Sequence, residues 1–291
     1  MVKKPKVCVL RTDGTNCDRE TNYAFNLVGA DSEIVHINSL IKKYDPVSDK
    51  NVSLDMYHIL AIPGGFSYGD YIRAGKRFTL EIMQFLDKEL EQFISEGKPV
   101  IGICNGFQVL VQSGLLPMLD GKMEQTTSLT YNDSNRFQDR WVHLVSPENN
   151  CIWTQGVEDI YVPVAHGEGK FVAQPETIDR LFEEHLVVYQ YADSDGKPTM
   201  DFPDNPNGSE RAIAGICDPT GKIFGLMPHP ERYNNPNNHY LASLQDILNR
   251  DYIDKSNPIV AKRLKQVGEV PEEGLGLEIF GNGVKYAEKN L

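Results

Sequence analysis

The chain has 291 residues, of which 41 are acidic and 29 are basic, so its formal net charge is −12. This length allows one large domain or two small ones, and it is enough to bury a substantial core. Nucleic acids and anionic membrane surfaces both attract Lys and Arg, so a chain this acidic is expected to bind neither.

The cysteines and the apolar runs indicate a cytoplasmic protein. The chain has five cysteines, an odd number, and no Cys-x-x-Cys pair, which argues against a disulfide framework and against a zinc knuckle. No apolar run approaches the roughly 20 residues that cross a membrane. The basic start of the chain is followed by only a short apolar run at residues 7–10, which is too short for a signal peptide and is predicted to be the first strand.

Short apolar runs alternate with longer helical segments in the first part of the chain, a pattern typical of a mostly parallel α/β sheet. The predicted strands are residues 7–10, 33–37, 57–62 and 99–103. The predicted helices are residues 18–28, residues 78–94 and a short helix that starts near Phe107. Helix 78–94 is expected to bury one wide face, because its apolar residues recur at helical spacing.

After Gly121 the pattern changes to strands, predicted at residues 141–145, 160–165, 186–192, 212–217 and 223–227. Residues 199–209 are turn-rich and are predicted to form an exposed loop. A helix is expected near residues 240–248. The chain is expected to close with an amphipathic helix, whose apolar face is Leu277, Phe280, Val284, Ala287 and Leu291.

No internal repeat or low-complexity linker divides the chain. We therefore predict a single domain over residues 1–291, with an α/β fold in which helices flank a mostly parallel central sheet. The polar, Pro- and Gly-punctuated stretch before the last helix is expected to lie on the surface.

The most informative segment is residues 99–108, where a buried strand leads into a cysteine and then into a helix. Cys104 has a glycine two residues before it and another two residues after it, which is the pattern of a nucleophile elbow with Cys in place of Ser. A helix that starts directly after the cysteine favours the reactive thiolate. The alternative is a structural cysteine at a strand end, and we favour the elbow.

A nucleophile needs a base, and the base needs a group that orients it. His229 and Glu231 flank a proline directly after the predicted strand 223–227, and α/β sheets place catalytic groups at the carboxyl ends of strands. The alternative is a capping histidine beside a solvated glutamate. Metal binding is disfavoured, because no third ligand lies close in the sequence. The next candidates, His166 and Glu168, are more than 60 residues away.

Gly64 and Gly65 also directly follow a predicted strand. Adjacent glycines let backbone N–H groups approach a ligand oxygen, as an oxyanion hole requires. Taken alone, this segment is more typical of a tight turn. The three segments become informative together, because each follows a strand and a single sheet edge could collect them all.

Together these segments resemble the class I (triad) glutamine amidotransferases. Residues 102–108 are similar to the nucleophile motif of that family, and residues 229–231 match its second motif. More narrowly, residues 63–75 resemble the glutaminase subunits of phosphoribosylformylglycinamidine synthase, as do residues 135–137, 166–169 and 227–232. The resemblance covers residues 6–233 and the terminal helix around residues 276–286, and it implies the flavodoxin-like fold of the family.

The resemblance implies roles for the matched residues. Cys104 would attack the side-chain amide of L-glutamine and form a glutamyl thioester, with His229 as general base and then acid, and with Glu231 orienting the imidazole. The backbone N–H groups of Gly65 and Asn105 would form the oxyanion hole. The candidate substrate-binding residues, of which the 135–137 segment could instead line a docking face, are Gly64, Gln108, Asn135, Arg136, Phe137 and His166.

The family also implies partners. The freed ammonia would pass to a large synthetase subunit, which converts formylglycinamide ribonucleotide to formylglycinamidine ribonucleotide in purine biosynthesis. A small bridging subunit is a further candidate partner. Nothing in the sequence resembles a P-loop, so ATP and Mg²⁺ are expected on the synthetase, and this chain is expected to hold no cofactor and no metal.

One segment departs from the family pattern, because residues 234–273 are longer than the usual link to the last helix. We expect a surface insertion there, with a contact to the synthetase as the alternative. Three other functions stay open: a class I glutaminase that serves a different acceptor synthetase, a Cys-containing α/β peptidase or stress protein of related fold, and a non-catalytic subunit. The match at residues 64–75 argues against the first, Asn105 in place of a histidine against the second, and the filled triad positions against the third.

Overall fold

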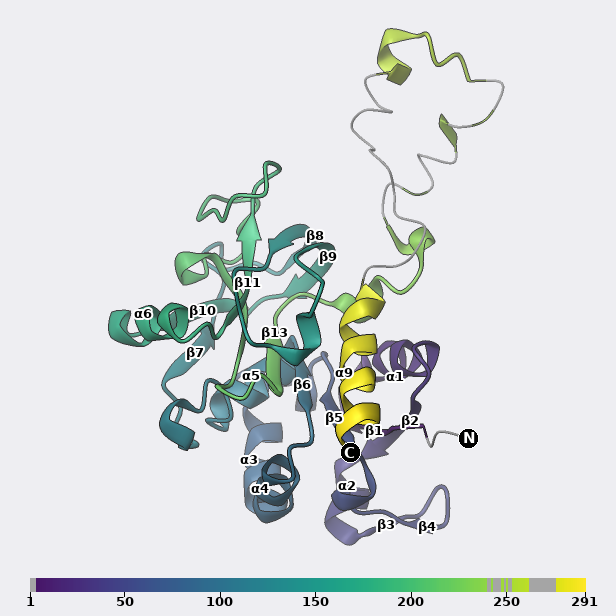
Figure 1. Ribbon diagram of the computed structural model, residues 1–291, viewed down its shortest axis with the longest axis vertical. Helices are drawn as coiled ribbons and strands as arrows, with labels where there is room; N and C mark the ends of the chain where they lie inside the picture. The colour runs from purple at the N-terminus through teal and green to yellow at the C-terminus, as the bar shows by residue number, and fades with distance from the viewer. Residues whose placement is uncertain (1–3, 240–241, 243–246, 249, 251–252, 262–275) are drawn as a thin grey trace.

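The structure is a computed structural model that describes residues 4–239, 242, 247–248, 250, 253–261 and 276–291. Its centre is a nine-stranded sheet with the order β2-β1-β5-β6-β13-β12-β11-β8-β9 (Figure 1). The strands of this sheet are β1 (Lys6–Arg11), β2 (Asp31–His36), β5 (Ile59–Ile62), β6 (Val100–Ile103), β8 (Gln138–Val145), β9 (Asp159–His166), β11 (Val187–Ala192), β12 (Ile213–Cys217) and β13 (Ile223–Leu226).

The five strands from β2 to β13 in this order pair in parallel, and the other four join antiparallel. Strands β5 and β6 are short apolar runs with every residue buried, as expected for parallel strands that are covered on both faces. The predicted α/β fold, with helices flanking the central sheet, is confirmed.

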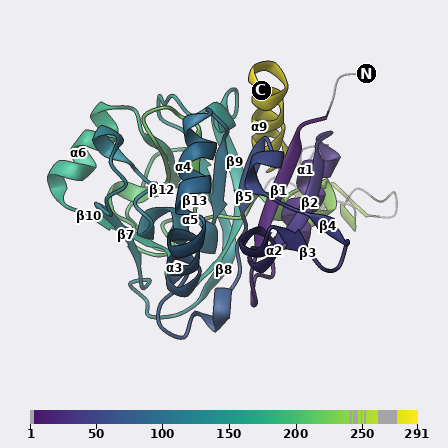
Figure 2. The same cartoon turned by 90° about the horizontal axis from the view of Figure 1, so that it is seen from below.

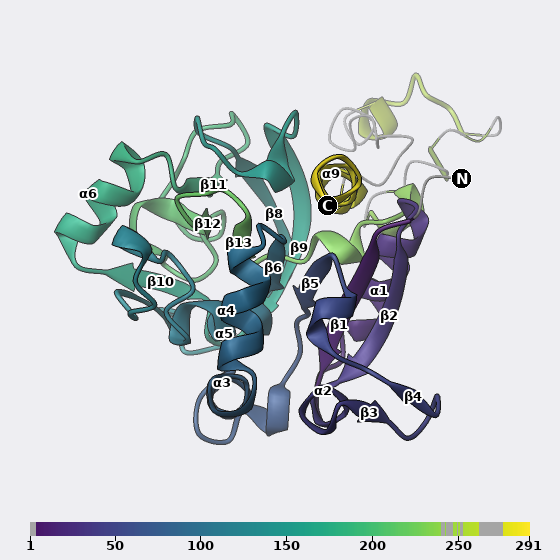
Figure 3. The same ribbon diagram turned by 60° about the horizontal axis from the view of Figure 1, so that its bottom comes forward.

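Helices cover both sides of the parallel part of the sheet (Figures 2 and 3). Helices α1 and α9 pack against each other on one side, where the rings of Phe25 and Phe280 meet edge to face at 4.9 Å. Helices α3, α4 and α5 lie on the other side. The helices are α1 (Asp18–Leu27), α2 (Ile37–Lys42), α3 (Lys76–Phe85), α4 (Asp87–Ser95), α5 (Asn105–Gln112), α6 (Pro175–Glu183) and α9 (Gly276–Asn290).

The parallel pairing brings the carboxyl ends of β1, β5, β6 and β13 to one edge of the sheet. The segments that leave these ends carry Cys17, Gly64, Cys104 and His229. The fold therefore gathers residues that are as much as 212 positions apart in the chain, as between Cys17 and His229.

The single helix predicted at residues 78–94 is wrong, because the structure has two helices, α3 and α4, that are separated at Leu86. Leu86 has φ −126° and ψ 8°, and its side chain is buried. The buried residues Phe78, Ile82, Leu86 and Leu90 are spaced by four, and each step of four drifts by about 40° around an α-helix. The break at Leu86 corrects this drift and keeps the apolar side chains on the core.

Two further predictions need correction. Residues 199–209 form a loop, but Asn205, Asn207 and Ser209 in it are buried. Asn205 bonds to the Ser209 carbonyl within the loop, whereas the side chains of Asn207 and Ser209 bond to backbone groups at residues 169 and 171. At the end of the chain, Leu291 follows α9 and is 45% exposed, so it is not part of the predicted apolar face.

The sequence analysis also missed several elements. Two small ribbons escaped it because their strands are too short to show a period; they pair β7 (Thr127–Thr130) with β10 (Lys170–Ala173) and β3 (Tyr44–Asp45) with β4 (Lys50–Asn51). Helix α6 starts with Pro175 at its first position, which is a helix-start signal that the sequence did carry.

The predicted helix at residues 240–248 and the predicted insertion at residues 234–273 lie largely outside the described residues, so both stay predictions, as does the single domain. Within the described residues, no helix combines the length and the apolarity that crossing a bilayer requires.

Candidate active site

The segment around Cys104 has the geometry of a nucleophile elbow. Strand β6 ends at Ile103, and α5 begins at Asn105, so Cys104 alone makes the turn, with φ 52° and ψ −103°. A Cβ atom on Gly106 would lie 1.8 Å from a backbone oxygen of β5, and one on Gly102 would lie 2.6 Å from the Gly106 oxygen. Both glycines are therefore needed for the turn to be this tight.

His229 and Glu231 form a buried pair directly after β13. Nδ1 of His229 lies 2.6 Å from Oε1 of Glu231, and the two side chains are 1% and 0% exposed. The His229 backbone N–H donates to the Pro163 carbonyl at 2.8 Å, which ties this segment to β9. Nε2 of His229 is buried and has no hydrogen-bond partner in the described part of the chain. The pair therefore leaves one imidazole nitrogen available for proton transfer.

The charge of Glu231 sets the protonation of His229. Burial alone would lower the pKa of His229, but the Glu231 carboxylate outweighs it, with further contributions from Cys104 and Cys17. The net effect raises the pKa well above its usual value. An imidazole that holds a proton strongly can stabilise a neighbouring thiolate.

Gly64 brings the nucleophile and the base together. A Cβ atom at this position would lie 2.8 Å from Cε1 of His229 and 3.3 Å from Cβ of Cys104. The two side chains therefore converge on the face of the backbone that Gly64 leaves open. The sequence analysis placed Gly64 among the substrate contacts, and the structure places it between the catalytic candidates.

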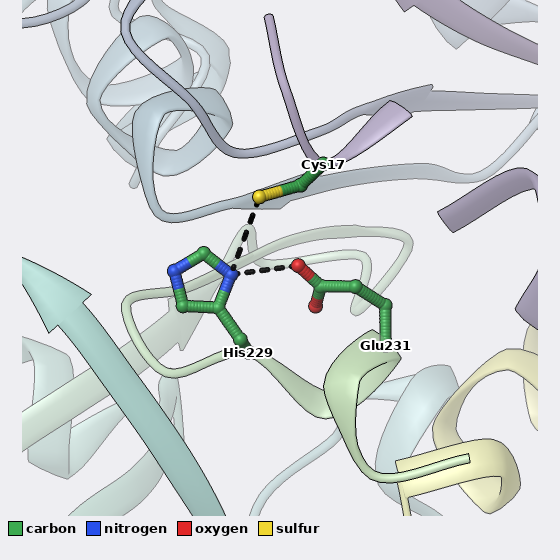
Figure 4. Close-up of side chains that lie close together, drawn as sticks. All are labelled: Cys17, His229 and Glu231. Atoms are coloured by element: carbon green, nitrogen blue, oxygen red, sulfur yellow. Dashed lines mark hydrogen bonds and ion pairs between the residues drawn. The ribbon is translucent and has the colours of Figure 1, made fainter. Parts of the chain in front are cut away.

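Cys17 also belongs to this cluster, and the sequence analysis did not single it out. Its sulfur lies 4.0 Å from Nδ1 of His229 (Figure 4) and accepts a hydrogen bond from Nη2 of Arg232 at 3.1 Å. Cys17 is 1% exposed. The only signal in the sequence was its place in the segment that follows the first strand, and spacing alone does not distinguish it from the other cysteines.

Cys17, His229 and Glu231 offer a sulfur, a nitrogen and an oxygen that all lie within 4.8 Å of one another. The structure thus supplies the third ligand whose absence disfavoured metal in the sequence analysis. However, the Arg232 guanidinium is 3.1 Å from the sulfur, and a cation there repels a second one. The cluster therefore fits an acid–base site better than a metal centre.

A pocket of about 140 Å³ opens over Cys104. Four of the predicted site residues line it together with Cys104, namely Gly65, Gln108, Phe137 and His166. At its rim the rings of Phe66 and Phe137 stack with centroids 6.2 Å apart. The pocket is small and leads to the sulfur, as a site for one amino-acid side chain requires.

Asn135 and Arg136 are exposed, and they are not among the described residues that line this pocket. Asn135 has φ 51°, and its backbone N–H donates to the Asn132 carbonyl at 2.8 Å. The Arg136 carbonyl accepts from the Asn132 side chain at 2.9 Å. The segment is thus an exposed turn that is fastened by Asn132.

Both ring nitrogens of His166 are already occupied. Nδ1 lies 3.2 Å from Oδ1 of Asn132, and Nε2 lies 3.4 Å from Nδ2 of Asn207. Burial, followed by the charge of His229, lowers the pKa of His166 to about 3, so the ring is neutral. The ring therefore holds two loops together at the pocket wall. A ligand could contact its carbon atoms but would find neither nitrogen available.

Gln108 and Asn105 connect the first turn of α5 to the loops around the pocket. Nδ2 of Asn105 donates to Oε1 of Gln108 at 3.1 Å, and Nε2 of Gln108 donates to the Glu168 carbonyl at 2.5 Å. Asn105 is the first residue of α5, where backbone N–H groups have no partner inside the helix. Its backbone N–H is thus suited to bind an oxyanion. Gly65, the other predicted donor, lines the same pocket.

Comparison with known proteins identifies the family. The model of the CobB/CobQ-like glutamine amidotransferase domain matches residues 4–286. The phosphoribosylformylglycinamidine synthase subunit PurQ of Dehalococcoides mccartyi is 43% identical over 291 residues, covering 99% of this chain and 100% of that protein. The subunit of the same name from Methanococcus maripaludis is 42% identical over 98% of both chains.

Solved structures agree with this assignment. A chain in the structure of PurLQS from Thermotoga maritima matches with a TM-score of 0.63 and 28% identity, covering 97% of this chain and 99% of that one. A glutamine amidotransferase from the same organism matches at a TM-score of 0.51 and 16% identity, which supports the fold alone. The chain therefore belongs to the CobB/CobQ-like glutamine amidotransferase family, among relatives named phosphoribosylformylglycinamidine synthase subunit PurQ.

Proposed function

We propose that this chain is the glutaminase subunit of a phosphoribosylformylglycinamidine synthase. The observation that carries the proposal is the elbow Cys104 beside a histidine whose Nδ1 is held by Glu231 and whose Nε2 is open. The relatives at 42–43% identity over nearly the whole length support the choice of acceptor enzyme.

In the proposed reaction, Nε2 of His229 takes the thiol proton of Cys104. The resulting thiolate attacks the side-chain amide carbon of L-glutamine. The imidazolium then gives this proton to the leaving nitrogen, which departs as ammonia and leaves a glutamyl thioester. Water, deprotonated by His229, hydrolyses the thioester to glutamate and restores the thiol. Glu231 keeps the imidazole oriented and stabilises its positive charge throughout.

The backbone N–H groups of Gly65 and Asn105 are proposed to bind the oxyanion that forms in each half of the reaction. Donors of this kind contribute roughly 3–4 kcal/mol each to transition-state stabilisation. Among the remaining candidates, Gln108, Phe137 and His166 are proposed as walls of the glutamine pocket, because all three line it.

Cys104, rather than Cys17, is proposed as the nucleophile, although both lie beside His229. The Cys17 sulfur is nearest to Nδ1, the nitrogen that donates its proton to Glu231, so that nitrogen cannot accept a proton from Cys17. Cys104 lines the pocket, whereas Cys17 is not among the described residues that do. Only Cys104 thus meets both the substrate and an available base.

We further propose that the ammonia is used by a synthetase subunit that binds ATP and Mg²⁺, that a small bridging subunit can join the complex, and that this chain needs no cofactor of its own. The PurLQS title of the matching structure supports a partner subunit. A cytoplasmic location agrees with five cysteines that are all free thiols.

The test is nitrogen transfer from L-glutamine labelled with ¹⁵N at the side-chain amide. The chain is mixed with the synthetase of its own organism, ATP, Mg²⁺ and formylglycinamide ribonucleotide. The proposal expects ¹⁵N in the formylglycinamidine product and glutamate release that rises when the synthetase is present. Glutamate release without stimulation or transfer would keep the glutaminase chemistry and assign it to a different acceptor synthetase.

A further inference from the structure

Two carboxylates in the pocket have no role in the chemistry above. Asp70 comes from the loop after β5, and Glu168 comes from the turn between β9 and β10. Both line the 140 Å³ pocket together with Cys104. Burial and, to a smaller extent, the charge of Glu168 raise the pKa of Asp70, so the two charges act on each other inside the pocket. Two carboxylates in this arrangement attract a cationic group.

Hydrogen bonds hold the Asp70 carboxylate and the Glu168 backbone in place relative to Cys104. Oδ1 of Asp70 accepts from Nδ2 of Asn105 at 3.3 Å and from the backbone N–H of Gly75 at 3.1 Å. The Glu168 backbone is held by Gln108, which is in turn bonded to the same Asn105 amide. Both loops are therefore fastened to the first turn of the helix that starts directly after Cys104, which is the kind of support a precise binding site needs.

Glu168 also keeps an unused acceptor. Its Oε2 atom is buried and has no hydrogen-bond partner among the residues that the structure describes. Nε of Arg73 lies 3.6 Å from this oxygen, close enough for charge attraction but longer than a hydrogen bond. A buried carboxylate oxygen without a donor is costly, so a ligand that brings N–H groups would be bound favourably here.

We propose that Asp70 and Glu168 bind the α-ammonium group of L-glutamine and thereby select an α-amino acid as the substrate. This inference rests on the proposed glutaminase function. When the amide carbon of glutamine lies against the Cys104 sulfur, the ammonium group lies a short aliphatic chain away within the same pocket. Each carboxylate then accepts a charge-assisted hydrogen bond, and the ammonium group compensates the repulsion between the two carboxylates.

The test compares L-glutamine with glutaramate, the analogue that lacks only the α-amino group. The quantity measured is kcat/KM for glutamate or glutarate release by the chain in complex with its synthetase. In Asp70→Asn and in Glu168→Gln, kcat/KM for glutamine should fall by roughly 10- to 100-fold. This is the loss expected when one hydrogen bond to a charged group is removed. For glutaramate it should stay within a few-fold, so the preference for glutamine collapses.

This ratio separates recognition from a structural effect. A variant that merely disturbs the pocket lowers kcat/KM for both compounds and leaves the ratio unchanged, and that result would overturn the assignment of the carboxylate concerned. Glu176→Gln, an exposed position on α6, is the matched control and should leave both values unchanged. Co-elution of each variant with the synthetase in gel filtration reports that the variant is folded and docked.

The two hypotheses fail differently. If the unmodified chain releases no glutamate from glutamine, with or without synthetase, then the proposed function fails. If the unmodified chain hydrolyses glutamine and both variants keep its preference over glutaramate, only the ammonium assignment fails.

Discussion

Oε1 of Glu231 lies 2.6 Å from Nδ1 of His229, in a contact that solvent does not reach. The two residues are separated only by Pro230, and the short 3₁₀ turn Pro230–Arg232 points both side chains to the same place. This contact fixes the tautomer of the imidazole and turns Nε2 toward proton transfer. The proposed roles of Cys104 and His229 both depend on it.

Replacing Glu231 by Gln should therefore weaken the base without removing it. The neutral amide no longer outweighs the effect of burial, so the pKa of His229 should fall. We expect kcat for glutamine hydrolysis to fall by about 10²- to 10⁴-fold, by analogy with the loss of the orienting carboxylate in other triads. The measurement is glutamate release by the complex as a function of pH. An unchanged rate and profile would contradict the role of Glu231.

Replacing Cys104 by Ala should abolish glutamine-dependent synthesis, with a loss of at least about 10³-fold, and should leave ammonia-dependent synthesis by the complex intact. Cys17→Ala is the comparison, because Cys17 is also buried and also lies beside His229. It should keep measurable glutamine-dependent synthesis. If Cys104→Ala loses both activities, Cys104 is structural.

Replacing Gly64 by Ala should inactivate the site without unfolding the chain. The added methyl group would lie 2.8 Å from Cε1 of His229, so the ring must move away from Cys104. A displacement of this kind costs about 10²-fold in rate. Gly281 offers the control, since among the described residues a methyl group there would meet only Val28, at 3.8 Å. Gly281→Ala should therefore keep full activity. Equal activity of the two variants would show that His229 does not depend on this space.

The neutral His166 predicts a loss of stability in acid. Its pKa is about 3 in the folded protein, against about 6.5 in an unfolded chain. Between these values the unfolded state binds a proton that the folded state does not, so the unfolding free energy falls as the pH falls. From pH 7 to pH 5 this one group should remove about 2 kcal/mol. Urea unfolding of the chain and of His166→Gln at both pH values tests this, because the variant should lose less stability on acidification.

The sequence was most informative where one residue type must occupy one position. Cys104 between its glycines, the paired His229 and Glu231, and the glycines at 64–65 all lie at the ends of buried strands, so the parallel sheet that the apolar runs predicted was enough to bring them together. Their chemistry is carried by residue type and spacing, both of which a sequence displays directly.

What the sequence could not give depends on contacts between distant segments. The place of Cys17 beside His229 follows from the order of strands in the sheet and not from any local spacing. The carboxylates of Asp70 and Glu168 reach one pocket from two loops, through side-chain bonds to α5. The break at Leu86 depends on which apolar side chains pack against the core, and the local sequence does not show this.

The most direct measurement of the central claim is the site of the covalent intermediate. The complex of this chain with its synthetase is mixed with L-glutamine, stopped in acid during turnover and digested, and the peptides are examined by mass spectrometry for an added glutamyl group. The account predicts this group on the peptide that contains Cys104 and its absence from Cys104→Ala. A glutamyl group on the Cys17 peptide, or none on any cysteine during active turnover, would contradict it.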